Sequence, residues 1–175
     1  MAENVRGIAL LYQDGPERDA GIALLSKVRG DTLRERFSHP VLPFIDVELA
    51  RQKARSGDLD GAIELSRPYV NAEPGAGAIA YFGLAVMVLV ESLLRRGTDS
   101  DLVDAKTAIA RLAAVSTSSG VVVFDVVVLR LRAVLARAQG DESTYRELVD
   151  RYRAMAESFG WRAISRWPPR CSNPR

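Results

Sequence analysis

The chain has 175 residues, which is enough to form a substantial hydrophobic core. Hydrophobic residues make up 47% and charged residues 26%, a balance that is typical of folded globular proteins and excludes an intrinsically disordered chain. The formal net charge of +2 is too small to indicate nucleic acid or an anionic membrane as the partner.

The cysteine content and the N-terminal sequence favour a cytoplasmic protein. Cys171 is the only cysteine, so no internal disulfide can form, which suits a reducing compartment. Residues 1–7 include Glu3 and lack the hydrophobic run of a signal peptide. The longest apolar stretch, residues 76–90, is shorter than the roughly 20 residues of a membrane-spanning helix. We therefore expect a buried helix there and no membrane segment.

Apolar residues recur at helical spacing along most of the chain, and glycine, proline and capping residues divide this pattern into about seven or eight helices. The expected helices span residues 4–13, 16–37, 44–56, 58–73, 78–96, 99–115, 121–139 and 142–159. We expect the second helix to continue through Gly30-Asp31, because Leu33 and Phe37 keep the apolar spacing. We also expect Pro68 not to end the fourth helix at once.

Three details around the sixth and seventh helices need separate arguments. Asp99 or Ser100 is the expected N-cap of the sixth helix. Residues 116–120 are small and polar, which predicts a loop. Residues 121–129 are rich in valine and resemble a buried strand, but no second strand-like segment exists to pair with them. Since they run without a break into residues 130–139, we predict a helix.

Glycine follows a helix at four nearly evenly spaced positions. These positions, separated by 42, 40 and 43 residues, are Gly15, Gly57, Gly97 and Gly140. Ala20 and Ala62 each stand five positions after such a glycine, where a small residue lets paired helices approach closely. This period predicts an all-α fold of antiparallel helix hairpins, a tetratricopeptide-like α-solenoid, with an irregular helical bundle as the alternative. We expect the repeat domain to span residues 1–160, followed by an irregular tail at 161–175.

Three segments also carry a family resemblance. They are LARQKARSGDLDGAIELSRPYV, LVESLLRRGTDSDLVDAKTAIARLAAV and LRLRAVLARAQGDESTYRELVDRYRAMAESFG. They resemble the C-terminal tetratricopeptide-like helical region of multidomain, mostly actinobacterial regulators. Those regulators carry a class III adenylate or guanylate cyclase domain or a LuxR-type DNA-binding domain, together with an AAA-type ATPase. The resemblance covers roughly residues 16–160 and implies a fold and a regulatory setting.

The resemblance does not extend to catalytic parts. The chain has no GxxxxGKS/T phosphate-binding loop, and no functional residue carries over. Carboxylates such as Asp58 and Asp60 fall at turns and on helix surfaces, where they cap helices or face solvent. His39 and Cys171 lack the neighbours that would make a metal site or a nucleophile. We therefore expect no enzymatic activity, no metal and no cofactor.

Arginine and aromatic residues of the later helices are the candidate partner-binding residues. They would form a basic strip for an acidic peptide or a phosphate, with the aromatic rings as a ligand cage. The alternative is local pairing along each helix, such as Asp150 with Arg153 or Glu147 with Arg151, and packing of the rings in the last hairpin. The candidates are Arg95, Arg96, Arg130, Arg132, Arg137, Tyr145, Arg146, Tyr152 and Trp161.

These patterns favour a non-catalytic interaction or regulatory domain, of a signalling or transcription-regulator type, that binds a protein or peptide on a concave surface. The resemblance implies a cyclase or ATPase module as the partner, and apolar faces at the ends of the array favour self-association. The alternatives are a nucleic-acid-binding transcriptional regulator, which the low net charge disfavours, and a small-ligand sensor.

Overall fold

A computed structural model describes residues 2–34, 40–73 and 79–160. Within these ranges the chain is all-helical and contains no strand, which confirms the predicted all-α helical-repeat fold and its number of helices. The eight helices are α1 (Ala2–Leu11), α2 (Pro16–Arg34), α3 (Leu42–Ser56), α4 (Leu59–Asn71), α5 (Ile79–Arg96), α6 (Asp99–Ser119), α7 (Val122–Ala138) and α8 (Glu142–Ser158).

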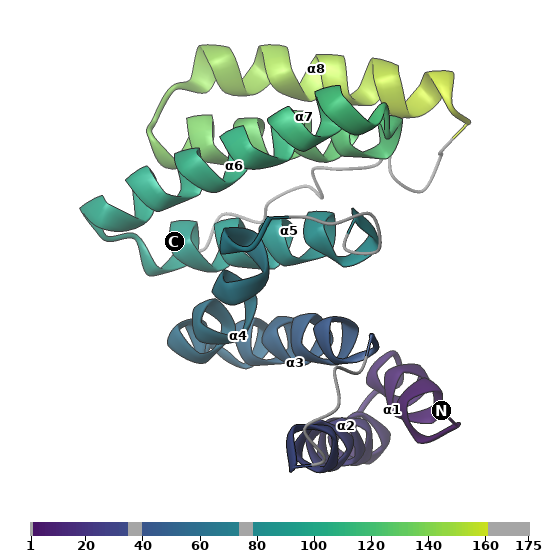
Figure 1. Ribbon diagram of the computed structural model, residues 1–175. Coiled ribbons are helices and arrows are strands. Elements are labelled where there is room, and N and C mark those ends of the chain that lie inside the picture. The colour runs from purple at the N-terminus through teal and green to yellow at the C-terminus, as the bar shows by residue number, and fades with distance from the viewer. Residues whose placement is uncertain (1, 35–39, 74–78, 161–175) are drawn as a thin grey trace. The chain divides into compact units, whose positions relative to one another are not determined.

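The helices fall into two compact units that divide between Arg95 and Arg96. In the first unit, α1 pairs with α2 and α3 with α4, and α2 also packs against α3 (Figure 1). In the second unit, α6 packs against α7, and α7 packs against α8. Within each unit, the paired helices follow one another in the chain, as a hairpin repeat requires.

The two helices of the first hairpin are in close contact at Gly7 and Gly21. A Cβ atom on Gly21 of α2 would lie only 2.9 Å from the carbonyl oxygen of Gly7 on α1. The prediction that Ala20 lies at this contact is wrong, because Ala20 is exposed and the buried Gly21 takes its place. A hydrophobic cluster also joins helices α1, α2 and α3. It consists of Leu11, Leu25, Ile45 and Leu49.

Helix α5 belongs to the first unit through contacts at both of its ends. The Tyr81 ring packs edge-on against the rings of Phe44 and Tyr69, with centroids 5.7 Å apart in each case. At the other end, Arg95 Nη1 donates to the carbonyl oxygen of Ala54 at 2.6 Å. Most residues of α5 between these contacts are buried. Among the helices of the described ranges, none has both the length and the apolar character that crossing a membrane needs.

The valine-rich segment is confirmed as the helix α7, which packs against α8. The core of this pair is formed by Val126, Leu129, Ala133, Leu148, Val149 and Tyr152. Valine is therefore not a strand signal here, because the buried face of a helix accommodates it once a partner helix covers that face.

The four glycine turns are confirmed, since Gly15, Gly57, Gly97 and Gly140 all have positive φ angles. At Gly57, φ is 93°, and the amide donates to the carbonyl oxygen of Ala54. This left-handed geometry strains any residue that has a Cβ atom, so the turn needs glycine. Asp58 then caps α4 as predicted, because its Oδ1 accepts from the Gly61 amide at 2.9 Å.

Both predicted helix continuations are confirmed. Helix α2 runs through Gly30 to Arg34, and α4 contains Pro68. The continuation to Phe37 lies outside the described residues.

The predicted N-cap of α6 is wrong. Thr98 is the N-cap, and it forms a reciprocal capping box with Asp101. The Thr98 hydroxyl accepts from the Asp101 amide, while Asp101 Oδ2 accepts from the Thr98 amide. Asp99 and Ser100 are exposed in the first turn. The reciprocal pair satisfies two amides at once, which neither alternative cap achieves.

The predicted loop at residues 116–120 is also wrong, because α6 continues to Ser119 and ends at Gly120. The hydroxyl groups of Thr117 and Ser119 donate to carbonyl oxygens one turn earlier, at Ala113 and Val115. Small polar residues favour loops because they compete for backbone hydrogen bonds, but here they bond back onto their own helix.

Candidate functional site

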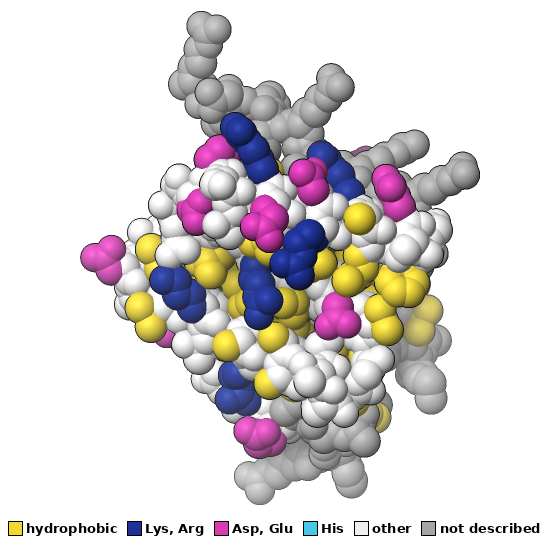
Figure 2. Space-filling view, turned by 90° about the horizontal axis from the view of Figure 1, so that it is seen from above, with side chains coloured by type: hydrophobic (Ala, Val, Ile, Leu, Met, Phe, Trp, Pro, Cys, Tyr) yellow, Lys and Arg dark blue, Asp and Glu magenta, His cyan; other side chains and the backbone are white. Residues whose placement is uncertain are grey.

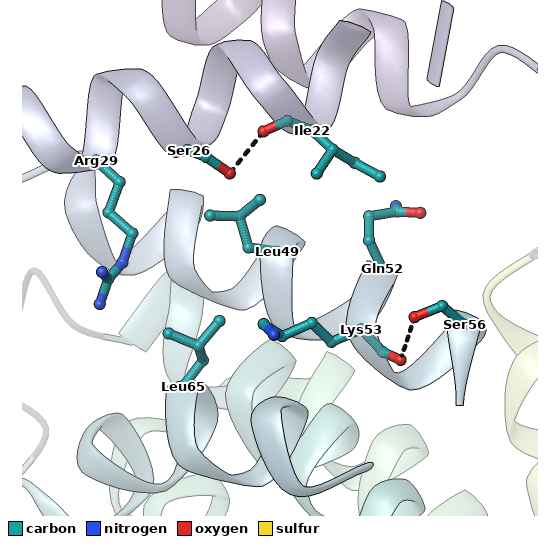
Figure 3. Close-up of a pocket in the computed structure, with 8 residues that line it drawn as sticks. All are labelled: Ile22, Ser26, Arg29, Leu49, Gln52, Lys53, Ser56 and Leu65. Atoms are coloured by element: carbon teal, nitrogen blue, oxygen red, sulfur yellow. Dashed lines mark hydrogen bonds between the residues drawn. The ribbon is translucent and has the colours of Figure 1, made fainter. Parts of the chain in front are cut away.

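The first unit contains a pocket of about 420 Å³ between α2, α3 and α4. This volume lies in the range of small-molecule sites. Its apolar lining consists of Ile22, Leu49 and Leu65 (Figure 3). Its polar lining consists of Ser26, Arg29, Gln52, Lys53 and Ser56.

Helical spacing explains why these residues line one cavity. Ile22, Ser26 and Arg29 are four and three residues apart, so they share one face of α2. Leu49 and Gln52 likewise share a face of α3. The two faces oppose each other because α2 packs against α3, and Leu65 of α4 closes the third side (Figure 3).

Arg29 is held at the pocket by a buried carboxylate. Its Nε donates to Asp46 Oδ1 at 2.5 Å, and the Tyr69 hydroxyl donates to Asp46 Oδ2 at 2.6 Å. Asp46 is only 4% exposed, so both donors compensate a charge that would otherwise be costly to bury. Burial, reinforced by the hydrogen bond to Asp46, raises the pKa of Tyr69 above its ordinary value of 10.0.

This environment predicts an alkaline instability. Because the folded-state pKa of Tyr69 is raised, its contribution to stability is present below pH 10 and decreases as the unfolded chain ionises above that pH. We expect the free energy of unfolding to fall above pH 10, and to fall less in Tyr69→Phe. Urea titrations followed by circular dichroism at pH 8 to 11 measure both slopes, and equal slopes would contradict the assignment.

Lys53 is anchored at the opposite side of the pocket. Its Nζ lies 2.6 Å from Asp58 Oδ2, and Figure 3 shows the side chain reaching toward Leu49 and Leu65. The hydrogen bond from Lys53 and then that from the Gly61 amide lower the pKa of Asp58. The ionised carboxylate of Asp58 is therefore stabilised both by Lys53 and by the backbone amide at the start of α4.

The Gln52 amide is the anomaly of the pocket. The residue is only 5% exposed, and its Nε2 is buried without a hydrogen-bond partner in the described part of the chain. Buried amide groups nearly always find partners in native structures. Because the Nε2 atom itself is inaccessible, this unpaired donor lies behind the pocket wall and adds a cost to folding.

The predicted candidates Arg95 and Arg96 have structural roles. Arg95 bonds to the backbone of α3, as described above. Arg96 donates from Nε and Nη2 to the two carboxylate oxygens of Asp101, at 3.0 and 2.5 Å. These contacts stabilise the end of α3 and the start of α6, respectively.

Four of the predicted candidates come together as two arginine–tyrosine pairs where α7 packs against α8. The guanidinium of Arg137 lies over the Tyr145 ring, 5.6 Å from its centroid, which is cation–π geometry. One heptad away, burial raises the pKa of Tyr152, and the positive charge of Arg130 opposes this rise. Both arginines and both tyrosines are seven residues apart, so each pair lies on one face of its helix.

The same spacing leads to apolar residues at the far end of the α7–α8 pair. Val123 and Phe159, each seven residues further along, are 42% and 44% exposed. A hollow of about 380 Å³ lies at this end. It is lined by Leu129, Arg151, Ala154, Met155, Ser158 and Phe159. The sequence prediction missed Phe159, although its heptad relation to Tyr145 and Tyr152 was a usable signal.

Among the remaining candidates, Arg146 follows the alternative of local pairing. Arg146 Nε lies 3.0 Å from Glu142 Oε1, one turn away. The two pairs expected from spacing are confirmed, since Arg151 lies 3.7 Å from Glu147 and Arg153 lies 3.7 Å from Asp150. Arg132 is exposed on α7. Trp161 lies outside the described residues.

Figure 2 looks onto the α8 side, where hydrophobic side chains lie among interspersed basic and acidic ones. Such mixed charge does not form the single-sign field that nucleic-acid binding uses. In the ranges that the structure describes, no group of three or more His, Cys, Asp or Glu residues is placed to hold a metal ion. His39 and Cys171 lie outside these ranges.

Comparisons with protein-family models, curated proteins and solved structures find no match to this chain. The resemblance to cyclase and LuxR-type regulators therefore stays a prediction that rests on the sequence segments quoted above.

Proposed function

We propose that this chain is a non-catalytic helical-repeat interaction domain that binds a protein or peptide partner. The observation that carries the proposal is the α7–α8 surface, which we define by Val123, Arg130, Arg137, Tyr145 and Phe159. It combines a cation–π pair, a second arginine and two exposed apolar side chains on consecutive heptads. Arginine and aromatic residues are enriched in protein interfaces and dominate their binding energy.

The hollow at the end of this surface favours a partner with an apolar side chain beside acidic groups. Leu129 and Met155 supply apolar walls, and Arg151 lines the same hollow. Arg151 is 62% exposed and lies 3.7 Å from Glu147, so exchanging that carboxylate for one of a partner costs little. An acidic peptide with one apolar anchor fits this arrangement.

The biological setting is part of the proposal. The sequence resemblance supports a cytoplasmic role in signalling or transcription regulation, with a cyclase or ATPase module as the partner. The number of paired helices and the absence of a phosphate-binding loop support a binding role over a catalytic one.

Peptide selection tests this proposal. A displayed random library is selected against the wild-type chain, and the enriched peptides are titrated against Arg130→Gln/Arg137→Gln. We expect enrichment of acidic peptides with an apolar anchor, and a loss of affinity of about tenfold or more in the double variant. Lys106→Gln, an exposed residue of α6, is the control and should bind normally. Enrichment of no sequence, or equal affinity for the double variant, would refute the assignment.

A further inference from the structure

The hollow at the end of the α7–α8 pair is lined mainly by one face of α8. Its lining residues there stand at positions i, i+3, i+4 and i+7 of the helix, so they share that face. They are Arg151, Ala154, Met155 and Ser158. Leu129 of α7 supplies a further apolar side chain. A single group of a partner that enters the hollow can therefore contact several of these side chains together.

The small residues of this face leave room for such a group. Ala154 and Ser158 lie one turn apart and are exposed, and their short side chains line the hollow between longer ones. The Ser158 hydroxyl donates to the carbonyl oxygen of Met155 at 2.7 Å, so its proton is used within the helix. A side chain that enters this space therefore needs no polar group of its own, which favours an apolar one.

Three of the lining groups are of kinds that bind aromatic rings. Thioethers such as that of Met155 make favourable contacts with ring edges. The exposed side chain of Phe159 offers a ring for edge-to-face or offset stacking. The guanidinium of Arg151 binds the face of a ring. An aliphatic side chain of similar size gains none of these three contacts.

The ion pair of Arg151 is compatible with this role. Its Nη1 lies 3.7 Å from Glu147 Oε1, and a guanidinium donates hydrogen bonds in the plane of its atoms. Stacking uses the face of that plane, so a carboxylate and an aromatic ring can be bound at the same time. The contact with a ring therefore does not require that Arg151 lose Glu147.

We propose that the hollow binds an aromatic side chain of the partner, and that Arg151, Met155 and Phe159 determine this specificity. The inference rests on the proposed function, because it names the apolar anchor of the acidic peptide that the α7–α8 surface would bind. The acidic residues of that peptide complement the arginines of the surface.

Two peptides that differ in one ring test the inference. Acetyl-Glu-Asp-Phe-Asp-Glu-amide carries an aromatic anchor, and its counterpart carries cyclohexylalanine, which is similar in size and more apolar but has no π electrons. If burial alone decided, the counterpart would bind at least as tightly. Titration into the full chain, followed by amide chemical shifts, should place both peptides at residues 151–159, with the phenylalanine peptide bound about tenfold more tightly. Its ring current should also shift the methyl resonance of Met155, which the cyclohexyl ring does not do.

Matched variants connect this preference to the lining residues. Met155→Leu keeps the volume of the side chain and removes the sulfur, and Arg151→Lys keeps the charge and removes the planar face. Each should weaken the phenylalanine peptide about threefold and leave the cyclohexylalanine peptide unchanged. Arg153→Lys is the control and should change neither affinity. Arg153 is exposed on the same helix and pairs with Asp150, and it is not among the described residues that line the hollow.

The outcomes separate this inference from the proposed function. Equal affinities of the two peptides at residues 151–159, or tighter binding of the cyclohexylalanine peptide, would overturn the aromatic anchor and leave the proposed function standing. Absence of binding by both peptides would count against the inference and the proposed function together. Shifts at residues 151–159 that grow with protein concentration alone would show that a second copy of the chain occupies the hollow, which also overturns the inference.

Discussion

Replacing Asp101 with alanine is expected to destabilise the second unit by about 3 kcal/mol or more. The Asp101 side chain is 1% exposed and accepts two hydrogen bonds from Arg96 and one from the Thr98 amide. Its loss leaves Arg96 without this partner and removes half of the capping box of α6. Urea unfolding followed by circular dichroism measures the difference from wild type.

Asp99→Ala is the matched control, because Asp99 lies in the same first turn but is exposed. We expect it to cost about 0.5 kcal/mol, the usual value of a surface charge at a helix N-terminus. Similar losses for the two variants would show that burial and pairing at Asp101 contribute little.

The Asp101 pair also predicts a dependence on pH. The hydrogen bonds from Arg96 hold the pKa of the Asp101 carboxyl well below its ordinary value of 3.8. Since the folded-state pKa is the lower one, this stabilisation is fully present above about pH 4 and is lost as pH falls toward the folded-state pKa. The stabilities of wild type and Asp101→Ala should therefore converge in acid below about pH 4.

Gly21→Val is expected to cost about 3 kcal/mol by separating α1 from α2. A Cβ atom at this position would lie 2.9 Å from the Gly7 carbonyl oxygen and 3.0 Å from the Leu11 amide nitrogen. Both are backbone atoms, which cannot rotate away, so the two helices must move apart. Hydrogen exchange should show early loss of protection in α1, and urea unfolding gives the free energy.

Gly30→Ala in the same helix should have the opposite effect. The nearest atom to a Cβ there is Arg34 Nη1 at 3.8 Å, at the flexible end of a side chain. The alanine should stabilise α2 by about 1 kcal/mol, because glycine is a poor residue for a helix interior. A destabilisation of equal size in both variants would contradict the proposed close contact at Gly21.

The elements that could be predicted from the sequence are those controlled by local chemistry. The turn at Gly57 depends on one residue that adopts a positive φ, and the capping of α4 depends on Asp58 three residues before the Gly61 amide. Residues 116–119 could not be assigned in this way, because their hydroxyls can serve a loop or a helix equally well. Ser116 donates to Asp125 at 2.6 Å, a contact with the next helix that no local pattern reveals.

The sequence predicts part of one candidate site and none of the other. Part of the α7–α8 surface can be predicted, because Arg130, Arg137 and Tyr145 fall on the two helices of one expected hairpin. The pocket of the first unit was not predicted. Arg29 and Gln52 lie on different helices, and their convergence depends on which faces of α2 and α3 pack together.

An amide chemical-shift map with a selected acidic peptide shows whether the peptide binds at the α7–α8 surface. We predict that the largest shifts fall at residues 123–137 and 145–159, and that they vanish in Arg130→Gln/Arg137→Gln. Largest shifts in α1–α4 or α6, or an unchanged map in the double variant, would contradict the claim.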